Sequence, residues 1–284
     1  MRLSLLFFSG YKMTKIKFTK MVASGNDFIV VENRGFKGLS LLAQSLCSRK
    51  FGIGADGLLL LEKGKNADIR MRIFNADGSE AAMCGNGARC VSLWLLEKSK
   101  VASGRARRLK INTRSGIITA EVMSDIVKIK LTDPKGLKLD MPIVINKRKL
   151  RVNFINTGVP HAVIFTQGLS DIDVRGLGRE VRYHGRFAPA GTNADFIEVL
   201  NNDSISIRTY ERGVEDETLA CGTGTVASAL IFALKSGSSG KVNVHTASKE
   251  VLKVYFERRE ESFRNVWLQG RARIVFKGEI KTRR

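Results

Sequence analysis

The sequence predicts an α+β protein of two pseudo-symmetric domains, each a curled, mostly antiparallel β-sheet around a central helix. Alternation of apolar and polar residues, the pattern of a strand with one wet face, recurs along the chain. Two helix-forming segments, 86–97 and 223–235, are apolar on nearly all sides and should therefore be completely buried. Matching turns precede both, "CGNG" at 84–87 and "CGTG" at 221–224. A sheet wrapped around each helix is the simplest arrangement that satisfies these patterns.

Short turns connect the strands expected from this alternation, which favours antiparallel pairing. The clearest strands are "IRMRI" at 69–73, "VKIKL" at 127–131, "ISI" at 205–207 and "VNV" at 242–244. Two further helices are expected at the surface, at 38–50, where Leu39, Leu42 and Leu46 have helical spacing, and at 171–183. The "SGSSG" at 236–240 predicts a turn between the second apolar helix and a strand, because strand signals resume directly after it.

A second similarity supports an internal duplication. The segment "GNDFIVVE" at 25–32 resembles "TNADFIEV" at 192–199. With one Cys-Gly-x-Gly turn in each half of the chain, a duplicated fold allows the two helix N-termini to face each other.

Length and composition describe an ordinary globular chain. It has 284 residues, of which 43% are hydrophobic and 26% charged, so one or two domains are expected. No apolar run approaches the roughly 18–20 residues that a membrane-spanning helix needs. The apolar part of residues 1–12 is shorter than a signal-peptide core, and no A-x-A cleavage site follows. We therefore expect residues 1–12 to be a dispensable extension before Met13, and the protein to be cytoplasmic with no membrane partner.

The cysteines and histidines argue against disulfides and metals. Four cysteines in a chain of this length do not form a disulfide framework: Cys47, Cys84, Cys90 and Cys221. The three histidines, at positions 161, 184 and 245, have no partner at metal-ligand spacing. The sequence thus predicts neither a metal site nor a metal cofactor.

The net charge of +21 suggests a basic nucleic-acid-binding protein as an alternative of another class. The basic residues, however, are spread along the whole chain, and the densest regions, 98–114 and 258–284, contain almost no aromatic residues for base stacking. A solvated basic surface is therefore favoured, and no specific nucleic-acid partner is expected.

The twin turns have a chemical interpretation. A helix N-terminus carries unpaired N–H groups and about half a positive charge, and the glycines of the turns let an anion approach the backbone. Each turn is therefore a candidate carboxylate cradle, and the same field should lower the pKa of its cysteine. A thiol on each side of one α-carbon is what a cofactor-free racemase or epimerase needs, since one removes the α-proton and the other returns it.

Packing is the alternative explanation for these residues. Buried cysteines and glycine-rich helix starts are both common, so either turn alone is readily explained by the core. Two matched turns are harder to explain in that way. Cys47 and Cys90 lie in predicted helices without such a turn and are expected to be core thiols.

The motifs around the turns resemble one known family. Six blocks occur in order, "KMVASGNDFIVVEN" at 20–33, "RKFGIGADGLLLLE" at 49–62, "RIFNADGSEAAMCGNGARC" at 72–90, "NTGVPHAV" at 156–163, "GTNADFIEV" at 191–199 and "YERGVEDETLACGTGT" at 210–225. Through them the chain from residue 13 onward resembles the diaminopimelate epimerases. The resemblance implies interconversion of LL- and meso-2,6-diaminopimelate, without cofactor, in lysine and peptidoglycan synthesis.

The resemblance also implies roles for individual residues. Cys84 and Cys221 correspond to the acid/base pair, and His161 and Glu211 match residues that tune or orient the thiols. Positions matching the cradle of the reacting carboxylate are Gly85, Asn86, Gly222 and Thr223, and positions matching other substrate contacts are Asn26, Asn75, Asn193 and Arg212. The planar fork of an arginine suits a second, distal carboxylate. Without the resemblance, the asparagines would be interpreted as turn residues and His161 as a packed strand residue.

The domain boundaries follow from the same resemblance, in which the C-terminal strand returns to the first domain. We expect an N-terminal domain of residues 13–132 plus 271–284 and a C-terminal domain of 133–270. The resemblance is also compatible with a homodimer.

The chain departs from the family at three positions, Val22, Gly57 and Val159, where many or some members have His, Gln and Asn. Val159 removes an amide that could contact the distal end of the substrate, and loss of such a hydrogen bond relaxes discrimination. We therefore expect looser specificity that extends to glutamate. A proline or hydroxyproline racemase is the alternative enzyme, although that family usually shows "CGH" in its first turn.

Overall fold

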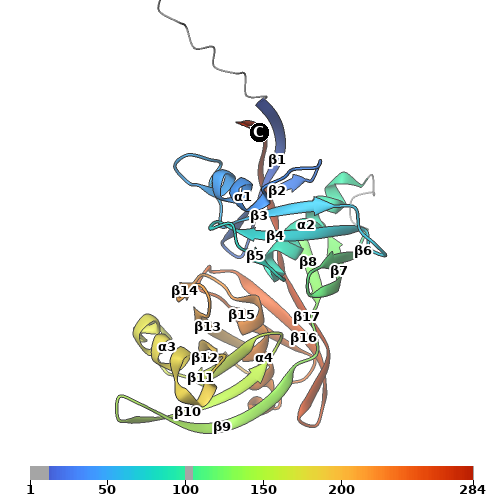
Figure 1. Ribbon diagram of the computed structural model, residues 1–284. Coiled ribbons are helices and arrows are strands. Elements are labelled where there is room, and N and C mark those ends of the chain that lie inside the picture. The colour runs from blue at the N-terminus through green and yellow to red at the C-terminus, as the bar shows by residue number, and fades with distance from the viewer. Residues whose placement is uncertain (1–12, 100–104, 284) are drawn as a thin grey trace, which may run out of the picture.

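The computed structural model describes residues 13–99 and 105–283, and its elements fall into two repeats. The first repeat contains β1 Met13–Ala23, β2 Asn26–Glu32, α1 Leu39–Cys47, β3 Gly57–Glu62, β4 Ile69–Asn75, β5 Glu80–Ala81, α2 Gly85–Lys98, β6 Arg107–Thr113, β7 Gly116–Met123 and β8 Ile126–Lys130. The second repeat contains β9 Lys135–Ile145, β10 Arg148–Asn156, β11 Pro160–Phe165, the 3₁₀ turns Leu169–Asp171 and Gly185–Phe187, α3 Val174–Tyr183, β12 Asn193–Asn201, β13 Ser204–Glu211, β14 Asp216–Thr218, α4 Gly222–Ser236, β15 Lys241–His245, β16 Val251–Arg259 and β17 Ser262–Arg271. The last strand, β18 Arg273–Arg283, follows. The repeats form the upper and lower lobes of Figure 1.

Both repeats have the same strand ladder. In the first, β2 pairs with β3 in parallel, β3 with β4 antiparallel and β4 with β6 in parallel, and β7 and β8 then follow antiparallel. In the second, β11, β12, β13, β15, β16 and β17 repeat these pairings in the same order and directions. Strand β18 pairs with β1 as β9 pairs with β10. The predicted α+β class with a duplicated, mostly antiparallel sheet is confirmed.

Each sheet curls around one buried helix. Helix α2 is buried from Asn86 to Trp94, and α4 from Gly224 to Ala233. Both helices contribute to a single apolar core that also contains side chains from the surrounding strands of both repeats. The two segments predicted to be buried on every side are therefore the central helices. The turn expected at 236–240 is also confirmed, because Gly237 ends α4 with a left-handed backbone, φ 76°, four residues before β15.

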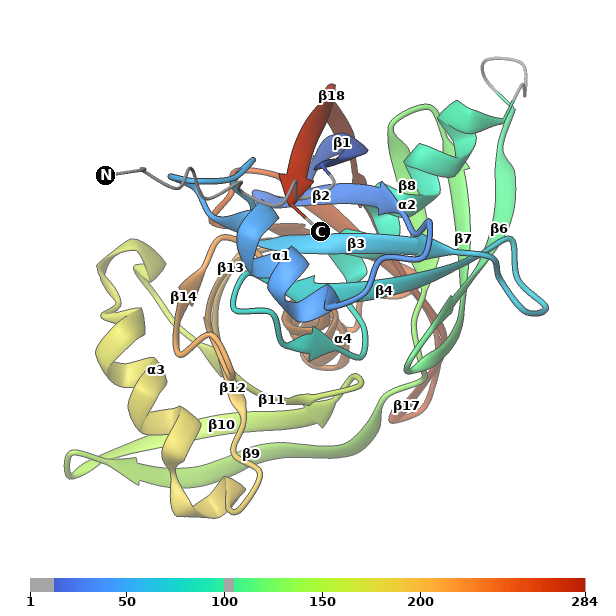
Figure 2. The ribbon, with the colours of Figure 1, turned by 45° about the horizontal axis from the view of Figure 1, so that its top comes forward.

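The two amphipathic helices cover the outer faces (Figure 2). Strand β3 contains four consecutive leucines, Leu58 to Leu61, all of which are buried. Leu59 and Leu61 face the core around α2, whereas Leu58 and Leu60 face the cluster under α1. Helix α3 covers the second repeat in the same way, over Ala194 and Phe196 of β12. Apolar residues on both faces are the expected pattern for a strand between two helical layers.

The pairing proposed from sequence similarity is wrong. Residues 26–32 form β2, whose counterpart by ladder position is β11, whereas residues 193–201 form β12, the counterpart of β3. The "DFI" similarity reflects the common requirement of a buried strand that starts next to a polar turn. In the correct equivalence, Cys84 corresponds to Cys221, which lies 137 residues later in the sequence. His161 then corresponds to Phe28.

One ladder joins the lobes. Strand β8 of the first repeat pairs antiparallel with β17 of the second, in a register that places Ile129 opposite Leu268.

The domain boundaries at 132 and 271 stay a prediction, and residues 1–12 lie outside the described ranges. In residues 13–99 and 105–283, no helix is both long enough and apolar enough to cross a membrane.

Candidate active site

The two Cys-Gly-x-Gly turns start the two central helices. Cys84 is the N-cap of α2, with φ −145° and ψ 119°, and Cys221 is the N-cap of α4, with φ −107° and ψ 115°. The N–H of Gly87 donates to the Cys84 sulfur over 3.4 Å. Both cysteines are free thiols.

Each turn packs against one member of the same cross-strand pair of side chains. A Cβ added to Gly85 would be 3.3 Å from Ile129 Cδ1, and one added to Gly222 would be 3.2 Å from Leu268 Cδ2. Ile129 and Leu268 are direct partners in the β8–β17 ladder. The Cα atoms of such antiparallel partners are about 4.5–5.5 Å apart. The pseudo-symmetry of the fold thus places the two helix N-termini against neighbouring side chains of one ladder.

Glu211, at the end of β13, lies close to both thiols. Burial raises the pKa of its carboxyl, and hydrogen bonds from Thr218 and Cys221 partly offset this effect. The Thr218 hydroxyl donates to Glu211 Oε2 over 3.0 Å. The Glu211 carboxylate also acts electrostatically on Cys84, in the other repeat. The structure therefore brings Glu211 together with both predicted acid/base cysteines.

Burial dominates the acidity of the two thiols. It raises the pKa of Cys84, and the N–H groups of Gly87 and Asn86 lower that pKa only in part. It raises the pKa of Cys221 well above the usual value, and the carboxylates of Glu211 and Asp195 act in the same direction. The prediction that the helix N-terminus lowers the thiol pKa is thus wrong in its net direction, because desolvation outweighs the N–H groups.

A buried hydrogen-bonded chain leads to Cys221. Thr209 Oγ1 donates to Asp195 Oδ1 over 2.8 Å, and Asp195 Oδ2 lies 2.7 Å from His161 Nδ1. His161 Nε2 is 2.9 Å from Thr223 Oγ1, which is 3.5 Å from the Cys221 sulfur. Asp195 and His161 have no solvent exposure. This chain holds the imidazole in one orientation behind the thiol and leaves a short route for proton exchange.

Among the residues that the structure describes, this hydrogen-bonded chain occurs in the second repeat and not in the first. By ladder position, His161 corresponds to Phe28, Asp195 to Leu59 and Glu211 to Asn75. The surroundings of the equivalent glycines support this correspondence. A Cβ added to Gly87 would contact Leu59, whereas one added to Gly224 would contact Asp195 and His161. The two thiols therefore lie in different electrostatic surroundings on the same scaffold.

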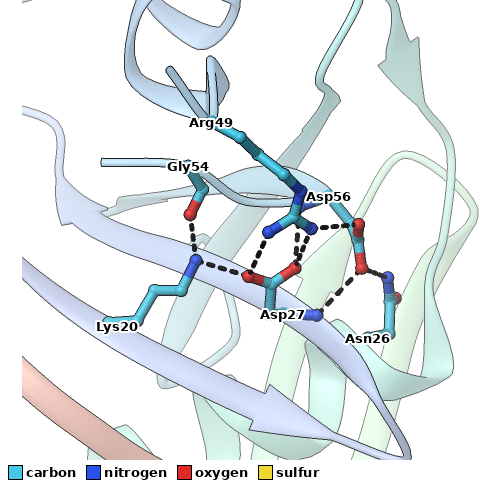
Figure 3. Close-up of polar contacts among 6 residues, drawn as sticks. All are labelled: Lys20, Asn26, Asp27, Arg49, Gly54 and Asp56. Atoms are coloured by element: carbon cyan, nitrogen blue, oxygen red, sulfur yellow. Dashed lines mark hydrogen bonds and ion pairs between the residues drawn. The ribbon is translucent and has the colours of Figure 1, made fainter. Parts of the chain in front are cut away.

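Asn26 is held at the Cys84 side by the cluster shown in Figure 3. Its amide nitrogen donates to Asp56 Oδ2 over 2.7 Å, so that its Oδ1 accepts from the Cys84 thiol at 3.9 Å. Arg49 Nη2 bridges Asp56 and Asp27, each at 2.8 Å. Burial acts to raise the pKa of Asp27, but hydrogen bonds from Arg49 and Lys20 outweigh it and hold that pKa well below its usual range.

The side chains of the other predicted substrate contacts differ in the hydrogen bonds that they make within the protein. Asn75 donates its amide to Ser79 Oγ over 2.9 Å within the β4–β5 turn. Asn193 donates to the Pro160 carbonyl and accepts from the Arg212 N–H, both at 2.8 Å. Arg212 Nη1 donates to the Ala190 carbonyl over 3.0 Å, and within the described residues it forms no ion pair. Asn193 therefore fixes the backbone that carries Arg212 and leaves that guanidinium able to bind a carboxylate.

Sequence reasoning missed Asp195, Asp56 and Arg89. Asp195 lies in the segment "GTNADFIEV" at 191–199, but the sequence does not show that the parallel pairing of β11 with β12 brings it next to His161. Arg89 has 0% exposure, and its Nη2 donates to Asn86 Oδ1 over 2.6 Å. The sequence does contain a signal for Arg89, because it is an arginine inside an otherwise apolar helix. In residues 13–99 and 105–283, no three His, Cys, Asp or Glu side chains gather as a metal site.

Comparisons with known proteins agree with the motifs. The family model described as diaminopimelate epimerase matches residues 18–135 and 153–275. The diaminopimelate epimerase of Caldanaerobacter subterraneus subsp. tengcongensis is 39% identical and covers 94% of this chain and 100% of its own. That of Aquifex aeolicus is 39% identical and covers 93% and 98%, and that of Archaeoglobus fulgidus is 39% identical and covers 94% and 97%.

Solved structures show the same fold at low identity. A PhzF-family phenazine biosynthesis protein from Bacillus anthracis superposes with a TM-score of 0.73 at 16% identity, covering 94% of this chain and 99% of its own. A hydroxyproline epimerase from Agrobacterium vitis gives 0.69 at 16% identity, covering 95% and 93%. The much higher identity to the epimerases above favours their family over the proline racemase alternative. The chain belongs to the diaminopimelate epimerase family.

Proposed function

We propose that this protein interconverts LL- and meso-2,6-diaminopimelate without a cofactor, with Cys84 and Cys221 as the acid/base pair. Two equivalent thiol-bearing helix N-termini, one packed against Ile129 and the other against its cross-strand partner Leu268, carry this proposal in a chain 39% identical to a diaminopimelate epimerase.

In the proposed reaction, a thiolate on one face of the substrate takes the α-proton, so that a C–H bond breaks and an S–H bond forms. The electron pair left on carbon is delocalised into the adjacent carboxylate. The thiol on the opposite face then donates its proton to the same carbon, which inverts the centre and leaves that sulfur as the thiolate. The two cysteines exchange roles for the reverse direction.

The helix N-termini support this chemistry by stabilising negative charge. The first N–H groups of α2 and α4 have no partner within their helices and converge on the turns. We assign the reacting carboxylate to Gly85, Asn86, Gly222 and Thr223, whose N–H groups would strengthen their bonds as charge develops on it. Arg212, which Asn193 positions, is assigned to the distal carboxylate, and Asn26 and Asn75 to the remaining polar contacts.

The same site explains the need for Glu211 and His161. Because burial raises the pKa of both thiols, a neighbouring proton acceptor would favour formation of the thiolate. Glu211 accepts a hydrogen bond from Cys221, and His161 reaches it through Thr223. We assign both residues to proton exchange with Cys221.

Deuterium exchange tests the proposal. Wild-type protein in deuterated water should incorporate deuterium at the α-carbon of LL- and meso-diaminopimelate and equilibrate the two isomers, as followed by chiral chromatography. Cys84→Ser and Cys221→Ser should each lower inversion at least about 100-fold. Cys47→Ala is the matched control, since that buried thiol belongs to α1 and not to the turns. Wild-type protein that neither exchanges nor inverts either isomer would refute the assignment.

Relaxed specificity is proposed for the same site. Val159 lies beside Pro160 at the start of β11 and offers no side-chain hydrogen bond to a distal amino-acid group. We expect slow inversion of glutamate, and Val159→Asn should lower it relative to diaminopimelate. Absence of detectable glutamate inversion by the wild type would end this idea.

We also propose a homodimer in the cytoplasm and no specific nucleic-acid partner. Light scattering at several concentrations tests the dimer. The basic nucleic-acid-binding alternative predicts instead that Cys84→Ser keeps a salt-sensitive affinity for DNA and that wild-type protein inverts no amino acid.

A further inference from the structure

Arg89 is a completely buried arginine in the first turns of α2. It is the bulkiest of the fully buried side chains among the described residues, with 0% exposure. Its Nη2 donates to Asn86 Oδ1 over 2.6 Å and to Ser24 Oγ over 2.8 Å, and its Nη1 donates to the Arg271 carbonyl over 3.0 Å. A buried charge is costly unless it is satisfied, so its presence needs an explanation.

These contacts join the two repeats behind the Cys84 turn. Asn86 and Ser24 belong to the first repeat, whereas Arg271 belongs to β17 of the second. The Ser24 hydroxyl in turn donates to Glu250 of the second repeat, whose other oxygen accepts from the Arg271 N–H at 3.1 Å. Gly270 is required for this approach, because a Cβ there would lie 2.0 Å from Arg89 Nη1.

The turn itself does not require an arginine. The equivalent position in α4 is Val226, a buried apolar residue, and α4 begins with the same Cys-Gly-x-Gly turn. Packing of a central helix is thus satisfied by an aliphatic side chain. The arginine is a specific feature of the Cys84 half of the site.

The orientation of Asn86 follows from Arg89. Because Oδ1 accepts from the guanidinium, the two amide hydrogens of Asn86 point away from it, and no acceptor for them exists among the described residues. Asn86 is the residue after Gly85 in the turn assigned to the reacting carboxylate. An amide without this bond could instead turn its oxygen toward that carboxylate, which would repel it.

The charge of Arg89 is also available to an anion at this turn. Within the described residues it forms no direct ion pair, and it reaches Glu250 only through Ser24. The charged or titratable groups that act on it are Glu250, Cys90 and Cys84. Cys84 in turn faces Arg89 from α2 and Glu211 from β13, which act in opposite directions on a thiolate.

We propose that Arg89 is a positioning residue for the Cys84 half-site: it orients the Asn86 amide to donate to the substrate carboxylate and places a buried positive charge behind the Cys84 sulfur. This inference rests on the proposed epimerase function. It accounts for the position of Arg89, for Gly270 opposite it and for the difference from Val226.

The test compares a variant that removes a positive charge with one that removes a negative charge. Arg89→Met removes the charge and the bonds to Asn86, so the acid limb of the pH profile of kcat/KM should move up by about half to one pH unit, and KM should rise about tenfold. Glu250→Gln keeps the shape of the network but removes a negative charge, so the limb should move down or stay. A role in anchoring the two repeats alone would lower the melting temperature in both variants and move neither limb.

A second readout does not depend on activity. The rate of alkylation of Cys84 by iodoacetamide, followed by mass spectrometry from pH 6 to pH 10, should shift in the same directions. Arg89→Lys keeps the charge but cannot reach three acceptors at once, so it should restore the alkylation profile and not the KM. If Arg89→Met does not fold, Arg89→Lys and Asn86→Ala test the proposal instead. Both variants disturb the bond between Arg89 and Asn86, so their effects on KM should not add in the double variant.

The outcomes separate this inference from the proposed function. Wild-type protein that does not invert diaminopimelate refutes the function. Wild-type protein that inverts it while Arg89→Met keeps both the alkylation profile and the KM, or while the KM effects of Arg89→Lys and Asn86→Ala add independently, refutes only the role of Arg89.

Discussion

Asp195 lies behind His161 in the interior of the second repeat, and both of its oxygens are used. One accepts from Thr209 and the other contacts His161 Nδ1. A carboxylate in this position fixes the tautomer of the imidazole, which then presents Nε2 to Thr223. In the proposed mechanism, Cys221 therefore depends on a carboxylate that is separated from it by two side chains, His161 and Thr223.

Replacement of Asp195 by Asn tests this dependence. The variant keeps the size of the side chain but removes the acceptor that selects the His161 tautomer, so kcat should fall at least about tenfold while KM changes little. Thr209→Val is the control, since it removes the other bond of Asp195 and keeps the carboxylate. Equal kcat in Asp195→Asn and wild type would contradict the role given to Asp195.

Cys47 gives a prediction for stability against pH. Burial raises its pKa from 9.0 to about 11 in the folded protein. Between these values the unfolded chain loses the thiol proton and the folded protein keeps it, so the stabilisation present below about pH 9 is lost as pH rises towards 11. The stability advantage of wild type over Cys47→Ala should shrink by about 1–2 kcal/mol across this range. Urea unfolding at pH 8 and 10.5 measures it, and a constant difference would contradict the prediction.

At the scale of elements, the two helix starts are built alike but supported differently. Gly87 and Gly224 are equivalent third residues of α2 and α4. A Cβ at Gly87 would lie 3.0 Å from Leu59 Cδ2, the flexible end of an apolar side chain. A Cβ at Gly224 would lie 2.4 Å from Asp195 Oδ1, which is fixed by the hydrogen-bonded chain.

The two glycines therefore form a matched pair of substitutions. Gly224→Ala should destabilise the protein by about 1–3 kcal/mol through overpacking and displace Asp195 from His161. In Gly87→Ala, the better helix propensity of alanine, about 1 kcal/mol, should offset most of the crowding. Urea midpoints measure the difference, and equal midpoints for the two variants would contradict it.

The elements themselves were largely predictable from sequence. The apolar segments 86–97 and 223–235 are recognisable as buried helices because no face of them is polar, and the alternation at 69–73 and 127–131 marks strands. The correspondence of β2 with β12 failed because short strand motifs carry no information on ladder position. Only pairing partners show that β2 corresponds to β11.

The candidate site was predictable only in part, for a related reason. The cysteines, His161 and Glu211 lie in recognisable motifs. Asp195, which contacts His161, and Arg89, which donates to Asn86, are brought to the site by strand register and burial, and both depend on the folded chain. The net pKa direction of the thiols also depends on desolvation, which a local motif does not report.

At the scale of the whole molecule, the site exists only where the repeats meet. Cys84, Asn26 and Asn75 come from the first repeat, and Cys221 and Glu211 come from the second. The core is continuous between them, since Ala88 and Val91 of α2 belong to the same apolar cluster as Val226 and Ala229 of α4. The β8–β17 ladder and the contacts of Arg89 add backbone and side-chain links.

This continuity predicts that the two lobes unfold together. The chain has two tryptophans, Trp94 in α2 and Trp267 in β17, so each repeat carries its own fluorescence probe. Both side chains are buried, with 7% exposure, and should report on local unfolding. In Trp94→Phe and Trp267→Phe, the remaining tryptophan should give a urea midpoint that coincides with the midpoint from circular dichroism of the same variant. Separated transitions would show that each lobe is stable alone, and the active site would then be held by an interface weaker than the shared core indicates.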